Sequence, residues 1–118
     1  MIPQTEVEIL AKKIFGRNVS SVWQINKVTI RIELTNDSFT DIFQSIKDPT
    51  KFAFHARLTK GKIYRLDCRP ERKYIKLKTF PWHFHKENED KVVSSPFSSD
   101  KSKALVQFLE FINSRNNS

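Results

Sequence analysis

The segment from Trp82 to Lys86 has the residue types and the spacing of an acid–base site. On a β-strand, alternate side chains point to opposite faces, so His83 and His85 would share one face. Two neighbouring imidazoles can divide the acid and base roles on a phosphodiester, or share a metal ion. They can also be half-buried residues beside an aromatic core. The segment alone leaves these three interpretations open.

A metal site at these histidines would need further ligands. Zinc sites in proteins use about four ligands, and His55 is the only other histidine of the chain. Asp67 or Cys68 could complete such a site only if the fold brought them close. We therefore predict no metal and no cofactor, and we favour an acid–base role for His83 and His85.

Four arginines lie in or beside one predicted hairpin, namely Arg57, Arg65, Arg69 and Arg72. Guanidinium groups bind phosphate oxygens in a bidentate manner, so the four could bind a nucleic-acid backbone. The alternative is an exposed, solvated face of a sheet. Asp67 lies among them and could pair with an arginine, orient a histidine or act as a base; pairing is the commonest of these roles.

Aromatic side chains near the same segments could stack on unpaired bases. The candidates for stacking are Tyr64, Tyr74, Trp82 and Phe84. A chain with ten Phe needs most of its aromatic rings for the core, so packing is the alternative for each. We predict nucleic-acid contacts for Tyr64 and Trp82, with Lys86 adding a positive charge.

The net charge of the chain limits the classes of partner that it is expected to bind. It has 21 Lys and Arg against 13 Asp and Glu, a net charge of +8 over 118 residues. Such a surplus attracts polyanions, although a solubility charge or a basic face for an acidic protein would look the same. The single cysteine excludes a disulfide within the chain, and no apolar run reaches the ~18 residues of a membrane span. We expect a soluble, cytoplasmic protein without membrane contact.

Two helices are predicted at the ends of the chain. The first covers residues 6–15 and begins at a capping box of Thr5 and Glu8. The second begins at a cap on Ser98 or Ser99 and presents an apolar stripe. The stripe consists of Leu105, Phe108, Leu109 and Ile112.

Alternation of apolar and polar residues predicts strands between these helices, most strongly over residues 28–35. Other candidate strands cover residues 22–25, 39–44, 52–58, 63–68, 74–77 and 92–93. The resulting fold class is α+β: a mostly antiparallel sheet of five to six strands with an N-terminal and a C-terminal helix packed on it. We expect a single domain over residues 1–118.

The predicted hairpin of residues 52–58 and 63–68 has two possible registers. A three-residue turn would place Arg57 opposite Arg65 and His55 opposite Asp67, whereas a two-residue turn would dissolve both pairs. The sequence leaves this choice open.

The hairpin and histidine segments resemble TumE-type toxins, the toxin halves of two-component toxin–antitoxin modules. The matching pieces are Phe54-His55-Ala56, Arg65-Leu66-Asp67-Cys68 and Thr79-Phe80-Pro81-Trp82-His83-Phe84-His85. The resemblance covers roughly residues 28–112 and implies a small cytoplasmic toxin neutralised by a DNA-binding antitoxin of helix-turn-helix type. Action on RNA is a further analogy with other small basic toxins.

The sequence departs from the family pattern at several positions. Cys68 stands where the family has Asn, Glu71 and Arg72 replace paired histidines, and Trp82 replaces the first histidine after proline. If the missing groups carry the family's activity, this protein has lost it.

Our first hypothesis is a toxin that acts on RNA as a metal-independent ribonuclease. His83 and His85 would transfer protons with help from His55, and Asp67 would orient a neighbour. The phosphorane charge would be stabilised by Arg57, Arg65 and Arg69. The alternative is a binding module without catalysis, for RNA or for an acidic partner protein. An exposed sheet edge or the Phe-rich helix could also support a homodimer.

Overall fold

The computed structural model describes residues 1–116, which form two α-helices and seven β-strands. In chain order these are α1 (Gln4–Phe15), β1 (Val19–Asn26), β2 (Thr29–Leu34), β3 (Phe39–Gln44), β4 (Phe52–Arg57), β5 (Ile63–Asp67), β6 (His83–Glu87), β7 (Val92–Ser94) and α2 (Lys101–Asn116). Two short 3₁₀ turns cover Gly16–Asn18 and Arg72–Tyr74.

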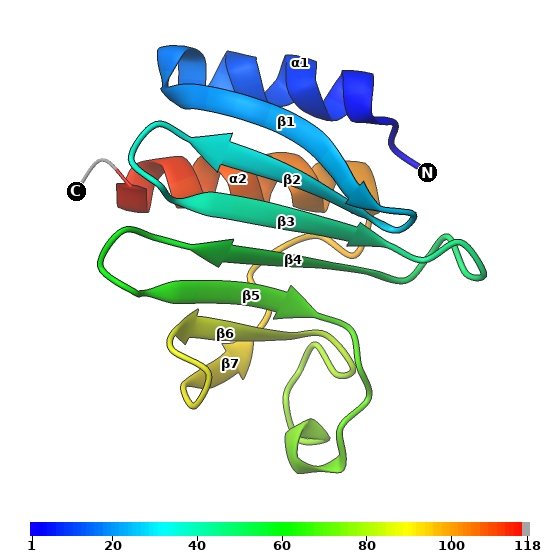
Figure 1. Cartoon of the computed structure of the whole chain (residues 1–118). Coiled ribbons are helices and arrows are strands. Elements are labelled where there is room, and N and C mark those ends of the chain that lie inside the picture. The colour runs from blue at the N-terminus through cyan, green and yellow to red at the C-terminus, as the bar shows by residue number, and fades with distance from the viewer. Residues whose placement is uncertain (117–118) are drawn as a thin grey trace.

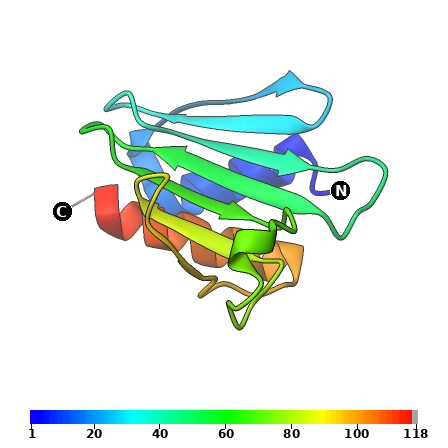
Figure 2. The ribbon, with the colours of Figure 1, turned by 90° about the horizontal axis from the view of Figure 1, so that it is seen from below.

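All the described strands form one antiparallel sheet in which each strand pairs with the next one along the chain. In Figure 1, α2 lies behind the middle strands and α1 runs beside β1. The two helices contact each other and lie side by side in Figure 2. The α+β class with a helix at each end is therefore confirmed. The sheet has seven strands instead of the predicted five to six.

The predicted strand over residues 74–77 is wrong. The chain there forms a helical turn, in which the Tyr74 N–H donates to the Glu71 carbonyl and the Ile75 N–H to the Arg72 carbonyl. The segment alternates apolar and basic residues, but it lies outside the sheet and Ile75 is 62% exposed. Alternation is therefore no guide to pairing where no neighbouring strand is present.

The core lies between the helices and one face of the sheet. Alternate residues of β2, β4 and β5 are buried on this face, as a half-buried strand requires. The predicted apolar stripe of α2 is buried against it, and the Phe54 and Phe108 rings lie 5.5 Å apart. We call the opposite side of the sheet the open face.

The helix ends differ from the predicted caps. Helix α1 begins at Gln4 without a side-chain cap, so the capping box of Thr5 and Glu8 is wrong; the Pro3 carbonyl accepts from the Glu6 and Val7 N–H groups instead. The cap of α2 is Asp100, whose Oδ2 accepts from the Lys103 N–H at 3.1 Å.

The structure decides the register of the β4–β5 hairpin, which the sequence left open, and neither of the two pairs of the three-residue alternative forms. His55 lies opposite Arg65, and Arg57 lies opposite Ile63. The turn closes where the Leu58 N–H donates to the Lys62 carbonyl at 2.8 Å, so the partner of His55 is two residues earlier than Asp67. Because the shift keeps the same alternation, His55, Arg57 and Arg65 remain on the open face.

Candidate functional site

A row of polar side chains crosses the open face, with one residue from each of five adjacent strands. From β2 to β6 the row consists of Arg31, Asp41, His55, Arg65 and His85. Each member lies opposite the next in the strand register, so their side chains are direct neighbours. We call this set the polar row.

Arg31 and Asp41 form a fixed ion pair at one end of the polar row. Arg31 Nε donates to Asp41 Oδ1 at 2.7 Å and Arg31 Nη2 donates to Asp41 Oδ2 at 2.8 Å. This bidentate hydrogen bonding raises the pKa of the Arg31 guanidinium. The Phe39 ring packs under the same guanidinium, 4.1 Å from its carbon, and limits its movement.

His55 occupies the centre of the polar row, between a carboxylate and a guanidinium. Burial lowers its pKa below the ordinary value of 6.5; Asp41 opposes this shift, and Arg65 adds to it. The lowered pKa favours the neutral imidazole near pH 7, which is the form that can accept a proton.

Arg65 and His85 are joined at the other end of the polar row. Arg65 Nη2 lies 3.2 Å from His85 Nε2 and 2.7 Å from Glu89 Oε2, while His85 Nδ1 lies 2.8 Å from the Glu89 carbonyl oxygen. A carbonyl only accepts and a guanidinium only donates, so His85 carries its proton on Nδ1 and accepts at Nε2. His85 therefore holds the Arg65 side chain in place.

His83 lies beside His85 under an aromatic cover. Its ring centroid is 5.1 Å from that of His85 and 4.5 Å from that of Tyr74. His83 is 0% exposed and His85 is 4% exposed. His83 Nδ1 lies 3.0 Å from the Pro81 carbonyl oxygen, while Nε2 has no hydrogen-bond partner among the described residues.

The predicted proton-transfer residues therefore meet on one face, although two of them are covered. His55 and His85 both neighbour Arg65, and Asp67 lies opposite His83 in the β5–β6 register. Asp67 Oδ1 accepts from the Arg69 N–H at 2.9 Å, so its carboxylate caps the start of the loop that follows.

The predicted phosphate ligands divide into two groups. Arg57 is exposed on the open face at the end of β4, and Arg65 is half-buried in the polar row. Arg69 and Arg72 are exposed on the loop between β5 and β6, outside the sheet.

Three predicted nucleic-acid contacts lie away from the polar row. Tyr64 is 1% exposed and faces the helices, so its ring cannot reach a base on the open face. Lys86 alternates with His85 and lies on the helix side, in a groove with Phe97. The Trp82 ring packs 4.5 Å from the Phe52 ring, against the core. Strand alternation and core packing direct these residues away from the polar row.

The sequence interpretation missed Arg31, Asp41 and Glu89 as members of this site. Arg31 could have been found, because it belongs to the polar half of the strongest alternating strand. No cluster of three or more His, Cys, Asp or Glu suited to a metal ion occurs within residues 1–116.

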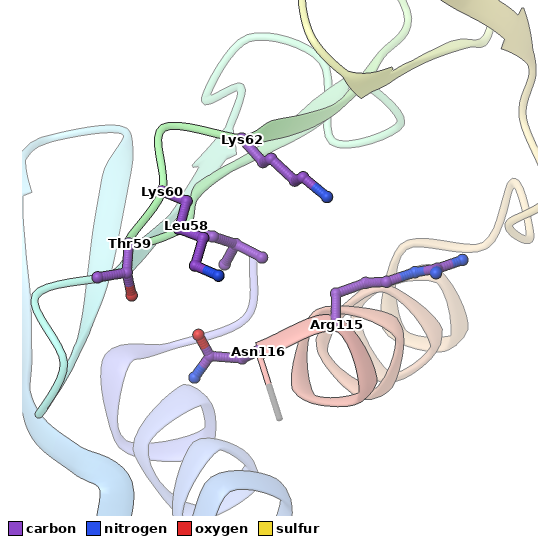
Figure 3. A pocket seen from close by; sticks show the side chains of 6 residues that line it. All are labelled: Leu58, Thr59, Lys60, Lys62, Arg115 and Asn116. Atoms are coloured by element: carbon purple, nitrogen blue, oxygen red, sulfur yellow. The ribbon is translucent and has the colours of Figure 1, made fainter. Parts of the chain in front are cut away.

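A separate basic hollow lies between the β4–β5 turn and the end of α2 (Figure 3). Its lining residues are Leu58, Thr59, Lys60, Lys62, Arg115 and Asn116. Figure 3 shows the two lysines reaching from the turn and Arg115 reaching from the helix. This basic hollow lies next to Arg57 along the chain, because its lining begins at Leu58.

The chain matches one protein-family model over most of its length. The family model described as toxin TumE matches residues 8–116, which include all seven strands, the whole polar row, α2 and all but the first turn of α1. The chain belongs to the TumE toxin family. No curated protein and no solved structure matches it. Membership of a TumE toxin family implies a cognate antitoxin as partner. None of the helices within residues 1–116 is long and apolar enough to cross a membrane.

Proposed function

We propose that this TumE-family chain is a cytoplasmic toxin that cleaves RNA without a metal ion, and that a helix-turn-helix antitoxin neutralises it. The polar row is the observation that carries the proposal, because it gathers imidazole and guanidinium groups from separate strands on the open face. The net charge of +8 favours contact with a polyanion.

RNA can be cleaved through its own ribose by an acid–base pair and positive charge. A base takes the proton of the 2′-hydroxyl, whose oxygen attacks phosphorus while the bond from phosphorus to the 5′-oxygen breaks. An acid protonates the departing 5′-oxygen, and the products are a 2′,3′-cyclic phosphate and a 5′-hydroxyl. Cations stabilise the negative charge that develops on the phosphorus oxygens.

The residues of the open face supply each of these parts. The imidazoles of His55, His83 and His85 divide the proton transfers, and Arg57 and Arg65 stabilise the charge on the phosphoryl oxygens. The support for Arg65 is its position: it lies opposite both His55 and His85, so one phosphate group could contact the guanidinium and an imidazole together.

The test is incubation of the purified protein with single-stranded RNA in EDTA. We expect 2′,3′-cyclic phosphate ends, and we expect about 10²- to 10⁴-fold slower cleavage in His55→Ala and in the double variant His83→Ala/His85→Ala. Circular dichroism shows which variants fold, and His55→Gln serves as a milder change. Intact RNA after incubation with the folded wild-type protein contradicts the catalytic proposal.

A second candidate function is RNA binding without cleavage. The observation that favours it is the burial of His83 and His85, which keeps both rings out of solvent. In that case Arg57 and the loop arginines would bind phosphates, and affinity would fall steeply with salt while the RNA stays intact. Binding of an acidic protein by the same arginines would instead leave RNA unbound at every salt concentration.

A further inference from the structure

The Nε2 atom of His83 is a buried hydrogen-bond acceptor. The Pro81 carbonyl, 3.0 Å from His83 Nδ1, can only accept, so Nδ1 carries the ring proton and Nε2 carries the lone pair. The side chain is 0% exposed, and Nε2 has no partner among the described residues. A buried acceptor without a donor is destabilising, so natural proteins retain few of them.

The Tyr74 ring is what covers this imidazole. It lies 4.5 Å from the His83 ring at an angle of 36°, and its edge also meets the His85 ring at 6.3 Å. Tyr74 belongs to the Arg72–Tyr74 turn, which has no strand partner. The cover therefore rests on ring contact with the sheet instead of a backbone ladder.

The covering segment is held mainly by bonds within itself. Within residues 71–77, the N–H groups of Tyr74, Ile75 and Leu77 donate to carbonyls three residues earlier, and the Glu71 N–H donates to the Arg69 carbonyl. Segments with few long-range bonds open at a small fraction of the free energy of global unfolding. The turn can therefore lift from the sheet while the strands stay paired.

The same segment carries a dense positive charge on its outer side. Its exposed cations are Arg69, Arg72, Lys73, Lys76 and Lys78, against the single acidic residue Glu71. A polyanion that contacts these cations gains binding free energy from the loop and from Arg57 together when the loop moves toward it. Such a ligand favours the lifted loop only if it binds the lifted state more tightly than the closed state.

We propose that the Arg72–Tyr74 turn is a lid over His83, and that the Nε2 atom beneath it binds a hydroxyl group of the RNA ribose. The inference rests on the proposed function and deepens it. Nε2 needs a hydrogen-bond donor; a phosphate diester has none, whereas the ribose 2′-hydroxyl next to it offers one. His83 is then the residue that takes the 2′-hydroxyl proton, and the freed Tyr74 ring is available to stack on a base.

The lid is tested by histidine accessibility in the absence of RNA. Diethyl pyrocarbonate modifies exposed imidazoles, and peptide mass mapping gives a separate rate for each of the three histidines. In the wild-type protein we expect His83 to react at least about tenfold more slowly than His55. Tyr74→Ala should raise the His83 rate about tenfold and leave the His55 rate unchanged, whereas Tyr74→Phe keeps the ring and should resemble the wild type.

Two results would overturn the lid. One is a wild-type His83 that reacts as fast as His55, and the other is a His83 that stays unreactive in a folded Tyr74→Ala variant. The Tyr74→Phe control separates loss of the ring from loss of the hydroxyl, which lies beside Lys73.

The ligand class is tested by comparing RNA with DNA of the same sequence on the Tyr74→Ala variant. Fluorescence anisotropy should show RNA bound about tenfold more tightly, and His83→Ala in this background should remove most of that preference, because only RNA offers the 2′-hydroxyl. Equal binding of RNA and DNA overturns the hydroxyl site. Neither measurement depends on cleavage. If both support the lid and the wild-type protein still leaves RNA intact, only the ribonuclease proposal is refuted.

Discussion

At the scale of single residues, the polar row is a set of opposed electrostatic effects. Burial and Arg65 lower the pKa of His55, whereas Asp41 raises it, and burial has the largest effect of the three. Arg31 holds Asp41 by two hydrogen bonds, so the carboxylate cannot turn to meet the imidazole without breaking them. The pKa of His55 is therefore lowered mainly by burial and adjusted by charged neighbours on both adjacent strands.

The first prediction concerns the pKa of His55. We expect a value below 6.5 in the wild-type protein, a lower one in Asp41→Asn and a higher one in Arg65→Ala, because Asp41 raises this pKa and Arg65 lowers it. The measurement is the pH dependence of imidazole signals in NMR spectra. A shift in the same direction in both variants would contradict these assignments.

The sign of this shift also predicts acid sensitivity. The unfolded chain binds a proton at His55 near pH 6.5, whereas the folded chain binds it only at lower pH. His55 therefore contributes stability above the unfolded pKa that is lost as the pH falls below it. The test is urea denaturation at about pH 7.5 and about pH 5.5, roughly one unit above and below the unfolded pKa. Between these two values, His55→Gln should lose less unfolding free energy than the wild-type protein.

At the scale of elements, the site depends on the packing of α2 against the sheet. Helix α2 follows β7 in the chain and returns across the covered face, where Phe108 contacts Phe54 of β4. Strand β4 carries Phe54 on the covered face and His55 on the open face. The helix therefore supports the polar row from the other side of the same strand.

The third prediction tests this support. Phe108→Ala should lower the free energy of unfolding by about 3–5 kcal/mol, because the Phe108 ring is fully buried. Ile9→Ala is the matched control on α1: its side chain is 70% exposed, and we expect a change within about 0.5 kcal/mol. Urea denaturation gives both values, and equal effects of the two substitutions would contradict the described core.

At the scale of the whole molecule, the core lies between the helices and one face of the sheet, while exposed cations are spread over the surface. Arg57 is exposed on the open face, the loop cations lie outside the sheet between β5 and β6, and the basic hollow lies at the β4–β5 turn. The helices occupy the other face, as Figure 2 shows. A long polyanion can therefore contact the positive surface without disturbing the core.

The fourth prediction concerns the salt dependence of RNA binding. Arg57→Ala should weaken binding to every RNA sequence and reduce the slope of log affinity against log salt by about one, which corresponds to one lost phosphate contact. Arg17→Ala removes the same charge from the exposed turn after α1 and serves as the control. Equal effects of the two variants would show that net charge alone determines binding.

Local patterns in the sequence were sufficient for much of the fold. Alternation over residues 28–35 placed Arg31 on the opposite face of the strand from Ile30 and Ile32. The same rule placed His83 and His85 on one face. The apolar stripe predicted the buried side of α2. These features follow from the geometry of a single strand or helix, so they need no knowledge of the partner.

Tertiary structure decided which residues meet. The β4–β5 turn closes at Leu58 and Lys62, and this register places Arg65 beside His55. The cover of Tyr74 over His83 joins residues from a loop and a strand. Register depends on turn geometry, and burial depends on contacts between distant segments, so neither can be read from the period of one element. The sequence alone determined the faces of the elements, and only the fold determined the neighbours across them.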